Sequence, residues 1–385
     1  MRFRSVGTAN SDSYRAGCEI GEALRDLSPE VILLFASISF EDDFADLFAG
    51  LYDGVGTTDV VIFGGTGDGI YESSLIAHYG VCALGITSDG LVRWSAAVET
   101  GVGANSAAAA LRCAESALAQ ADGPVSWAFV LADGVRADGT GIVAGIGSVV
   151  NTPFVGGLAG DDRRFSRSRI LFNGREVEDG VAVLLARGDL PFITNAASGW
   201  TPFGSAGIVE ECRDSSIYRI SGRAPMSFIR EQIDKPLTDA DLGMISLAIY
   251  RDEGDTSFSL RSLSRFNDPG DAVTTFGSIE QGAVVRVCGI SEKQALLGVS
   301  SALEGIRRSG FTPAAAIIVS CVGRKWLLDD AWRQEVELVQ KALGSHLPLV
   351  GFPSFGEIGP ILTAEGTYGE NLFHNVSFVI CLLGE

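Results

Sequence analysis

The stretch PLVGFPSFGEIGP, residues 348–360, carries the pattern on which the fold depends. Its apolar start stops at Gly351, and two phenylalanines, two more glycines and the carboxylate of Glu357 follow. An apolar run that ends at glycine is typical of a buried strand followed by a tight corner. Related endings occur at VVIFGGTGDG, residues 60–69, and at PFVGGLAGDD, residues 153–162. The sequence therefore predicts three strands that each end in glycines and an acid.

Each of these strands is preceded by a second apolar run, at residues 31–37, 126–133 and 314–321. The segments between the runs show a helical period, and in the third Leu328, Trp332, Val336, Val339 and Leu343 fall on one face. Strand, helix and strand within about 30–40 residues form a βαβ unit, whose two strands run parallel. We expect three such units, with hairpin-like strands after the second and third.

The length of 385 residues suits two domains of roughly 100–200 residues each. A helix-like segment precedes both the second and the third unit, so the two halves of the chain resemble each other. The join is expected after the turn-rich stretch SGWTPFGSAG, residues 198–207. We predict an α/β fold of two related domains, residues 1–213 and 214–385, with mixed sheets built from repeated βαβ units plus antiparallel hairpins.

The carboxyl ends of parallel strands share one edge of a sheet, and ligands of open α/β sheets bind beyond that edge. The loops that follow the predicted strands should therefore form the site. The residues expected to bind a ligand are Gly156, Gly157, Asp161, Cys321, Arg324, Gly351, Phe352, Phe355 and Glu357.

These residue types suit a small zwitterion. Glycine corners let backbone N–H groups approach an anion, and Arg324 could clamp a carboxylate. Glu357 or Asp161 would hold an ammonium group, while Phe352 and Phe355 would pack on the apolar part. A bland alternative stays open for each: the glycines as mechanical corners, Arg324 as a solvated arginine at a helix start.

Cys321 is the one thiol at a predicted strand carboxyl end. A structural, buried cysteine is the commoner interpretation, and no histidine lies near it in sequence to act as a base. The glycine corners lack the GK[ST] ending of a phosphate loop and the GxGxxG pattern of dinucleotide sites. The three histidines stand in unrelated contexts, so we expect no metal, no nucleotide and no other cofactor.

A formal net charge of −19 opposes binding to nucleic acid and to anionic membranes. No apolar run approaches the ~20 residues that span a bilayer, and the start of the chain does not have the form of a signal peptide. Seven scattered cysteines without a CxxC pair are typical of a reducing compartment. A cytoplasmic protein without membrane insertion is expected.

Several motifs resemble the FIST family of bacterial sensory modules, from about Val31 onward. In the C-terminal half they are residues 321–324, Glu335, residues 351–352, GEIGP at 356–360 and His374-Asn375; in the N-terminal half they are VILLFAS, residues 64–69, PFVGGLAGDD and residues 200–204. The family pattern has a threonine-containing stretch after His374-Asn375, where this chain has Val376-Ser377. The resemblance implies a FIST N-terminal domain followed by a FIST C-terminal domain.

The resemblance also implies a function. We expect a small-ligand-binding sensory protein, with amino acids or similar zwitterions as candidate ligands, rather than an enzyme. The sequence ends at Glu385, just after the last predicted strand, and no effector domain follows, so we expect output to pass to a signalling partner in trans. A homo-oligomer stays open. The alternative is a cofactor-independent hydrolase or isomerase that uses Cys321 with Glu357 or Asp161 as base. A third reading is an oligomeric interaction protein whose glycine corners only pack.

Overall fold

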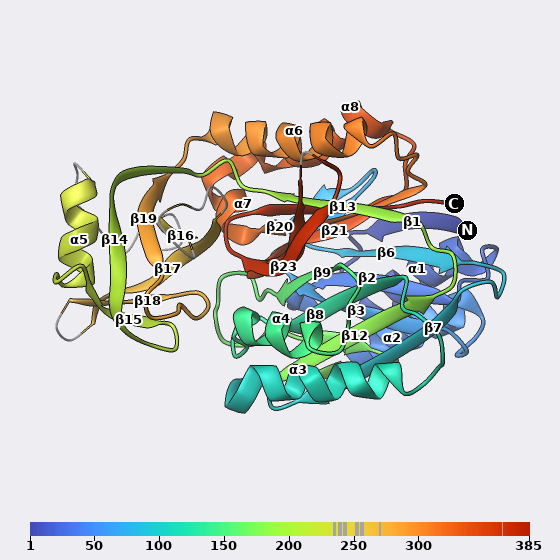
Figure 1. Ribbon diagram of the computed structural model, residues 1–385. Helices are drawn as coiled ribbons and strands as arrows, with labels where there is room; N and C mark the ends of the chain where they lie inside the picture. The colour runs from blue at the N-terminus through green and yellow to red at the C-terminus, as the bar shows by residue number, and fades with distance from the viewer. Residues whose placement is uncertain are drawn as a thin grey trace.

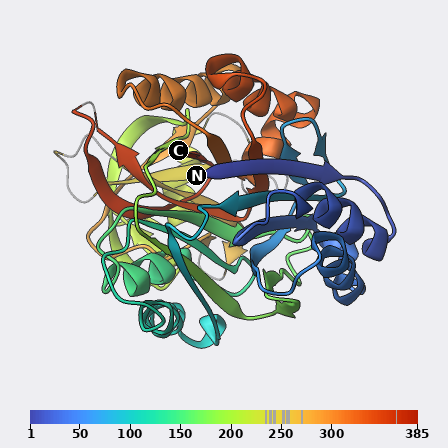
Figure 2. The same cartoon turned by 90° about the vertical axis from the view of Figure 1, so that its right-hand side faces the viewer.

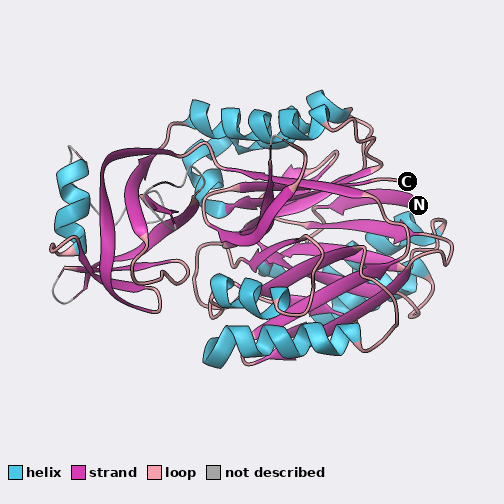
Figure 3. Ribbon diagram, viewed as in Figure 1, coloured by secondary structure: helices cyan, strands magenta, loops and turns pink. Residues whose placement is uncertain are grey.

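The computed structural model describes residues 1–233, 236–237, 241, 245–250, 254, 258–268, 271–363 and 365–385. The chain forms two parts, a core of three six-stranded sheets and a smaller closed barrel at one end of it (Figure 1). Helices cover the outside of the core, and strands fill its middle (Figures 2 and 3). This confirms the predicted class, an α/β fold with mixed sheets.

The three sheets of the core share one topology. The first has the order β1 (Arg2–Thr8), β6 (Val81–Thr87), β2 (Val31–Ser37), β3 (Val61–Gly67), β10 (Ile170–Phe172), β11 (Arg175–Val177). The second runs β7 (Arg93–Thr100), β12 (Gly180–Arg187), β8 (Trp127–Asp133), β9 (Phe154–Ala159), β22 (Gly356–Leu362), β23 (Tyr368–His374). The third runs β13 (Phe192–Ala197), β24 (Phe378–Leu383), β20 (Ala315–Cys321), β21 (Leu349–Ser354), β4 (Ile70–Glu72), β5 (Ile76–Ala77).

Each sheet contains one parallel pair, β2 with β3, β8 with β9 and β20 with β21. These are the strands of the three predicted βαβ units, so the parallel pairing expected from the sequence is confirmed. All other neighbouring strands of the three sheets run antiparallel.

The repeats interlock by exchanging hairpins. The hairpin β4-β5 follows the first parallel pair in the chain but extends the third sheet. In the same way, β10-β11 follows the second pair but extends the first sheet. The hairpin β22-β23 follows the third pair but extends the second sheet. The exchange closes a ring of three related units. The third sheet therefore needs strands from both ends of the chain, and the two predicted halves are held together by strand pairing.

Helices pack on the outer faces of the sheets: α1 (Ser13–Arg25) and α2 (Phe44–Val55), α3 (Val102–Leu118) and α4 (Gly139–Gly147), and α6 (Glu292–Arg308), α7 (Val322–Leu328) and α8 (Gln334–Leu343). The predicted apolar face from Leu328 to Leu343 is mostly buried. Its helix is interrupted, because a 3₁₀ segment at Asp329–Arg333 separates α7 from α8.

The inner faces of the three sheets meet in one central apolar cluster. Phe35 of β2 stacks on Phe352 of β21, with ring centroids 4.6 Å apart, and meets the edge of Phe129 of β8 at 6.4 Å. These rings come from all three sheets, so their burial fixes the sheets against one another.

One glycine of each corner is required by the parallel pairing. A Cβ at Gly64 would lie 1.7 Å from the carbonyl oxygen of Leu34, and one at Gly156 would lie 1.9 Å from that of Val130. At Gly351 the distance to the Ile318 oxygen would be 2.0 Å. Each glycine is paired with that residue on the neighbouring parallel strand. The recurring glycines therefore serve close approach of the two strands.

The barrel interrupts the third repeat between β13 and α6. It consists of β14 (Thr201–Arg213), β15 (Ser216–Ile220), β18 (Ala272–Thr275), β17 (Ser259–Asp268), β16 (Ser246–Tyr250) and β19 (Val284–Gly289), with α5 (Pro225–Gln232) packed against it. The predicted domain boundary after Arg213 falls in the turn between β14 and β15. Among the described residues, no helix is both long enough and apolar enough to cross a membrane.

Candidate functional site

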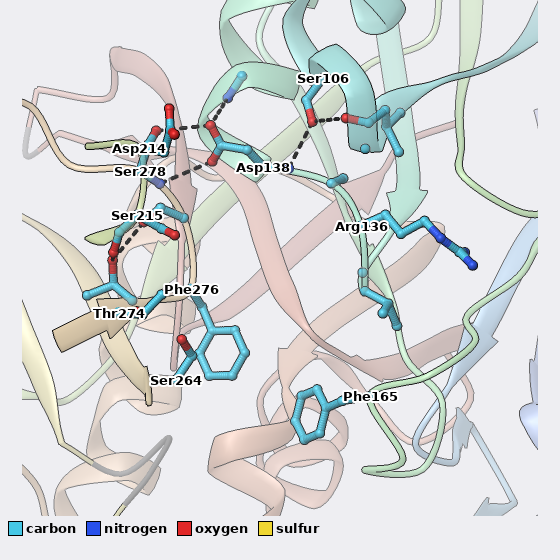
Figure 4. A pocket seen from close by; sticks show the side chains of 18 of the residues that line it. Ser106, Arg136, Asp138, Phe165, Asp214, Ser215, Ser264, Thr274, Phe276 and Ser278 are labelled. Carbon is cyan, nitrogen blue, oxygen red and sulfur yellow. Dashed lines mark hydrogen bonds between the residues drawn. The ribbon is translucent and has the colours of Figure 1, made fainter. Parts of the chain in front are cut away.

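A cleft of about 1220 Å³ lies between the core and the barrel (Figure 4). On the core side it is lined by the start of α3, the loop from β8 to α4 and the loop after β9. On the barrel side it is lined by β17, β18 and the turns around them. Clefts between two packed bodies are common places for ligands, so the cleft is the candidate site.

Asp138 fixes the core wall of the cleft to the barrel. As N-cap of α4 it accepts bonds from the backbone N–H groups of Thr140 and Gly141, at 3.2 and 3.3 Å. It also accepts bonds from the backbone N–H and the hydroxyl of Ser278 in the barrel, at 3.1 and 3.0 Å (Figure 4). With four donors around it, this carboxylate acts as a joint between the two parts.

A second joint is made by Arg261 of β17, which is buried. Its Nη1 donates to the carbonyl of Phe373 at 2.9 Å, and its Nη2 donates to the Thr140 hydroxyl at 3.0 Å. Burial lowers the pKa of this guanidinium to about 10, so it stays charged near neutral pH. The barrel is thus held to the core through buried polar contacts.

Asp133, at the buried end of β8, organises the loop that follows. Its carboxylate accepts bonds from Val135 N at 2.8 Å, Ser168 Oγ at 2.8 Å and Asp179 N at 2.9 Å. It also pairs with Arg136 at 3.0 Å, and that arginine reaches Glu178 at 3.3 Å. Arg136 lines the cleft, but its charge is already shared by two carboxylates.

The loop after β9 has an unusual backbone. Asp162, Arg163 and Phe165 have φ angles of 57°, 62° and 48°, in the left-handed region that residues other than glycine rarely adopt. The buried carboxylate of Asp161 compensates by accepting backbone N–H bonds from Phe165 (2.8 Å), Ser166 (2.6 Å) and Arg167 (2.8 Å). Backbone held in such conformations is often found at ligand sites.

The first repeat supports this loop from below. Asp68 is buried, and its Oδ1 accepts the backbone N–H of Asp162 at 2.7 Å. Burial raises the pKa of Asp68 to about 7. Lys325 of α7 donates to the Asp68 carbonyl and lies over the ring of Trp332, 4.9 Å from its centroid. The glycine corner of one repeat thus positions the cleft loop of the next.

Aromatic rings form the floor of the cleft. Phe165 is 43% exposed and stacks on the buried Phe355, with centroids 4.7 Å apart. It also stacks on Phe276 of the barrel at 5.9 Å and meets the edge of Trp326 at 6.3 Å. The floor therefore combines rings from the core and the barrel and offers an apolar, flat surface.

Charged groups of both signs line the cleft. The Arg163 guanidinium lies 3.7 Å from the centroid of the Trp326 ring, and within the described residues it makes no ion pair. Asp214, in the barrel turn, lines the cleft, and its carboxylate makes no hydrogen bond to the described part of the chain (Figure 4). The cleft can thus offer a cation, an anion and an aromatic surface to a ligand.

Four residues predicted to bind a ligand lie inside the core instead of along the cleft. Gly156 and Gly351 lie against strand carbonyls, and a Cβ at Gly157 would lie 2.6 Å from Val319 Cγ1. Phe352 is fully buried in the central cluster. Phe355 and Asp161 lie directly beneath the cleft, where the former supports Phe165 and the latter holds the loop.

Arg324 is fully buried, with all its donors directed inward. Its Nε donates to Glu335 Oε1 at 2.8 Å and its Nη2 to the carbonyl of Ala295 at 2.9 Å. Its Nη1 donates to the carbonyl of Ser198. The other oxygen of Glu335 accepts the hydroxyl of Ser320 at 2.7 Å. This buried network satisfies the guanidinium and joins the helices of the third repeat to its sheet.

Glu357 is also fully buried and has internal partners. It accepts bonds from Ser354 Oγ at 2.6 Å and from the backbone N–H and hydroxyl of Ser377 at 3.0 and 2.8 Å. Burial raises the pKa of this carboxyl to about 8. It is therefore mostly neutral at pH 7 and does not present a charge to the cleft.

Cys321 lacks the surroundings of a nucleophile. Burial raises the pKa of its thiol well above the usual range, and the nearby Glu357 acts in the same direction. A reactive cysteine needs a lowered pKa or a base within hydrogen-bond reach. Asp161 and Glu357, the bases considered from the sequence, are occupied by other donors.

The residues selected from the sequence did not include Arg163, Asp214, Phe276 or Trp326. These residues come from segments far apart in the chain, so no local motif joins them. One signal was available: residues 208–289, most of the barrel, have no counterpart in the first half. A segment that breaks a repeat is a candidate for a site at its junction.

Comparisons with known proteins agree with the family motifs. The FIST N domain matches residues 30–223, and the FIST C domain matches residues 226–360. The uncharacterized protein Rv0628c of Mycobacterium tuberculosis (strain ATCC 25618 / H37Rv) is 25% identical over 233 residues, 57% of this chain and 59% of the relative. The uncharacterized protein Mb0898c of Mycobacterium bovis (strain ATCC BAA-935 / AF2122/97) is 25% identical over 231 residues, 57% of this chain and 58% of that protein.

The chain thus spans less than two thirds of the length of these relatives. Among solved structures, "Crystal structure of cyanuic acid hydrolase from A. caulinodans" aligns with 100% of this chain and 98% of its own, at 8% sequence identity and a TM-score of 0.39. A likeness at this level carries no functional argument.

Proposed function

The chain belongs to the FIST family of sensory-type modules, and on that premise we propose that its cleft binds an amino acid or a similar small zwitterion. The observation that carries the proposal is a cleft with an aromatic floor that is also lined by an arginine and an aspartate without ion-pair partners among the described residues. Arg163 would bind the carboxylate of the ligand, and Asp214 would bind its ammonium group. Phe165, Phe276 and Trp326 would cover its apolar part.

The preparation of the cleft supports this proposal. Asp161 and Asp68 hold the loop that carries Arg163 and Phe165 in a defined conformation before any ligand arrives. Pre-organisation of this kind lowers the entropy that binding costs. In this scheme Asp161 and Phe355 act indirectly, by positioning the residues that touch the ligand.

We further propose that the protein works in the cytoplasm and passes its signal to a separate partner. All seven cysteines are free, which suits a reducing compartment. The cleft is lined by both the core and the barrel, so a ligand would stabilise one placement of the barrel on the core. A partner that recognises that placement would read the occupied state.

The test begins with isothermal titration of the purified protein with the individual amino acids. At least one should bind, and Arg163→Gln should weaken that binding by about 10- to 100-fold, since a hydrogen bond to a charged group contributes roughly 1.5–3 kcal/mol. Asp214→Asn should act similarly, and asparagine tolerates the φ of 52° at this position.

Arg164→Gln is the matched control, because Arg164 is the neighbour of Arg163 but pairs with Glu41 at 2.9 Å. It should leave the affinity unchanged. Mass spectrometry of ligands released from freshly purified protein gives an independent identification. Equal effects of the Arg163 and Arg164 substitutions, or no binding by any amino acid, would contradict the proposal.

A further inference from the structure

A second cavity, of about 250 Å³, shares no residue with the cleft. It is lined chiefly by Ala197, Phe258, Leu260, Ile361, His374 and Ser377, which come from both the core and the barrel. Leu260 and His374 are the chain neighbours of Arg261 and Phe373, whose buried hydrogen bond joins the two parts. Ala197, Phe258 and Ile361 are only partly buried, so the cavity reaches solvent.

His374 supplies the polar feature of this cavity. Its Nε2 lies 2.9 Å from the carbonyl oxygen of Gly359, and because a carbonyl can only accept, Nε2 carries the proton. Burial lowers the pKa of the ring to about 4, which keeps it neutral. Nδ1 is then an acceptor, and no described residue donates to it. The residue is only 5% exposed, but Nδ1 is not fully enclosed, so this acceptor keeps accessible surface on a residue that lines the cavity.

Among the residues that the structure describes, no charged side chain lines the cavity. Behind its wall, Ser377 Oγ donates to Glu357 Oε2 at 2.8 Å, and that carboxyl group is mostly neutral at pH 7 because its pKa is raised to about 8. The remaining lining is mainly aliphatic and aromatic. A charged ligand would lose its hydration here without a partner of opposite charge, which is costly. The chemistry of the cavity therefore selects neutral molecules.

The volume sets the size of the ligand. A dry apolar cavity of about 150 Å³ is known to hold benzene. The larger volume of this cavity, about 250 Å³, leaves room for a ring with substituents. The ring would contact Phe258 and Leu260 from the barrel and Ile361 from the core.

We propose that this cavity is a second binding site, for a small neutral ring compound that donates one hydrogen bond to His374 Nδ1. Phenol is the simplest probe of this kind, and toluene has the same size without the donor. The site is separate from the cleft, so its occupation does not depend on the zwitterion proposed above.

Nitrogen NMR of protein labelled with ¹⁵N-histidine tests the contact directly, because the chain has only three histidines. Phenol should shift the His374 Nδ1 signal in a saturable way, whereas toluene should leave it nearly unchanged. Signals of His78 and His346 serve as internal controls, since neither residue lines the cavity. Failure of phenol to move the His374 signal would overturn the proposal.

Substitutions at Ala197 and His374 test whether phenol binds in this cavity. Ala197→Leu should fill the cavity and reduce phenol affinity at least tenfold, while Arg163→Gln in the cleft should not change it. His374→Phe should reverse the preference of phenol over toluene; if that variant does not fold, the labelled wild-type protein still decides the matter. Phenol binding that survives Ala197→Leu, or that is lost with Arg163→Gln, would place the probe elsewhere and refute the assignment.

Discussion

Glu357→Gln tests whether the buried carboxyl group is neutral in the folded protein. Burial raises the pKa of Glu357 from 4.5 to about 8. Glutamine has the shape of the protonated acid. Its oxygen can accept the bonds from the backbone N–H and hydroxyl of Ser377, and its amide can donate to Ser354 Oγ. The Ser354 hydroxyl would then donate to the carbonyl of Ser320, 3.3 Å away. The substitution therefore keeps these bonds, and the second N–H of the amide adds a cost in stability that does not depend on pH.

The pH dependence of the free energy of unfolding gives the size of the expected effect. Between pH 4.5 and about 8 the unfolded chain has lost the Glu357 proton while the folded protein keeps it, so this group makes stability fall as pH rises. At about 1.36 kcal/mol per pH unit, the two units from pH 6 to pH 8 correspond to a loss of about 3 kcal/mol. Little more is lost above pH 8, where the folded form also ionises. The glutamine variant lacks this loss, so its stability relative to wild type should rise by about 3 kcal/mol between pH 6 and pH 9.

Urea unfolding followed by the fluorescence of the buried core tryptophans, Trp127 and Trp332, measures this difference. All other titrating groups are common to both proteins and cancel in the comparison. Glu304→Gln is a suitable control, since Glu304 is half exposed on α6 and pairs only weakly with Arg307 and Arg308. If the stability difference between wild type and Glu357→Gln is the same at pH 6 and pH 9, the carboxyl is not neutral in the folded state and the reasoning fails.

Three further outcomes follow from the same contacts. Gly156→Ala should destabilise the core by more than about 3 kcal/mol, because the added Cβ would lie 1.9 Å from a carbonyl oxygen. The control Gly147→Ala, whose Cβ would have nothing within 4 Å, should hardly change the melting temperature. Equal melting temperatures of the two variants would contradict the close approach at Gly156. Asp161→Ala should raise hydrogen exchange at the amides of Phe165, Ser166 and Arg167 by about a hundredfold, as about 2–3 kcal/mol of charge-assisted bonding is lost; unchanged exchange would mean that the loop holds itself. Cys321 should resist iodoacetamide at pH 8 until the protein unfolds, while the partly exposed Cys18 reacts earlier; rapid labelling of Cys321 would restore the nucleophile hypothesis.

The repeated parallel pairs could be predicted because each depends on local signals. Runs such as VILLFAS are continuous and apolar, and the parallel partner strand carries a glycine, here Gly64, that the close approach of the two strands requires. The exchange of hairpins could not be predicted, because the apolar run of β10 looks the same whichever sheet it joins. Ile170 of β10 pairs with Gly65 of β3, which lies about a hundred residues earlier in the chain. Strand pairing over such separations leaves no trace in local periodicity.

The candidate cleft was missed for a related reason. The loops at the carboxyl ends of the strands were expected to meet one another, and Asp161 and Phe355 do lie near the cleft. However, the end of β3 in the first repeat is covered by a side chain of the third repeat, since a Cβ at Gly67 would lie 2.8 Å from Phe352 Cβ. The end of β20 in the third repeat is covered by the barrel, where Cys321 packs with Leu260 and Cys288. The cleft opens where the loops of the second repeat meet the barrel, and Trp326 of the third repeat forms part of its lining.

Comparison of the three repeats shows how Glu357, the acid in the stretch 348–360, differs from the residues at the same position in the other two repeats. In register, Gly64 faces Leu171, Gly156 faces Ile358 and Gly351 faces Tyr71. The residues just before these partners are Ile170, Glu357 and Ile70, and all three are fully buried. Two repeats thus fill this position with isoleucine, and the third fills it with an acid.

A buried acid replaces apolar packing with a hydrogen-bonded group, and its burial costs little free energy only while the group is neutral. Glu357 achieves this through Ser354 and Ser377, and Ser377 in turn lines the second cavity. Because the same position is apolar in the other two repeats, packing alone does not require a glutamate there. The second binding site proposed above would give it a role, because the carboxyl holds the hydroxyl of Ser377, a residue that lines that cavity. On this proposal the acid supports the wall of the cavity, one residue removed from the ligand.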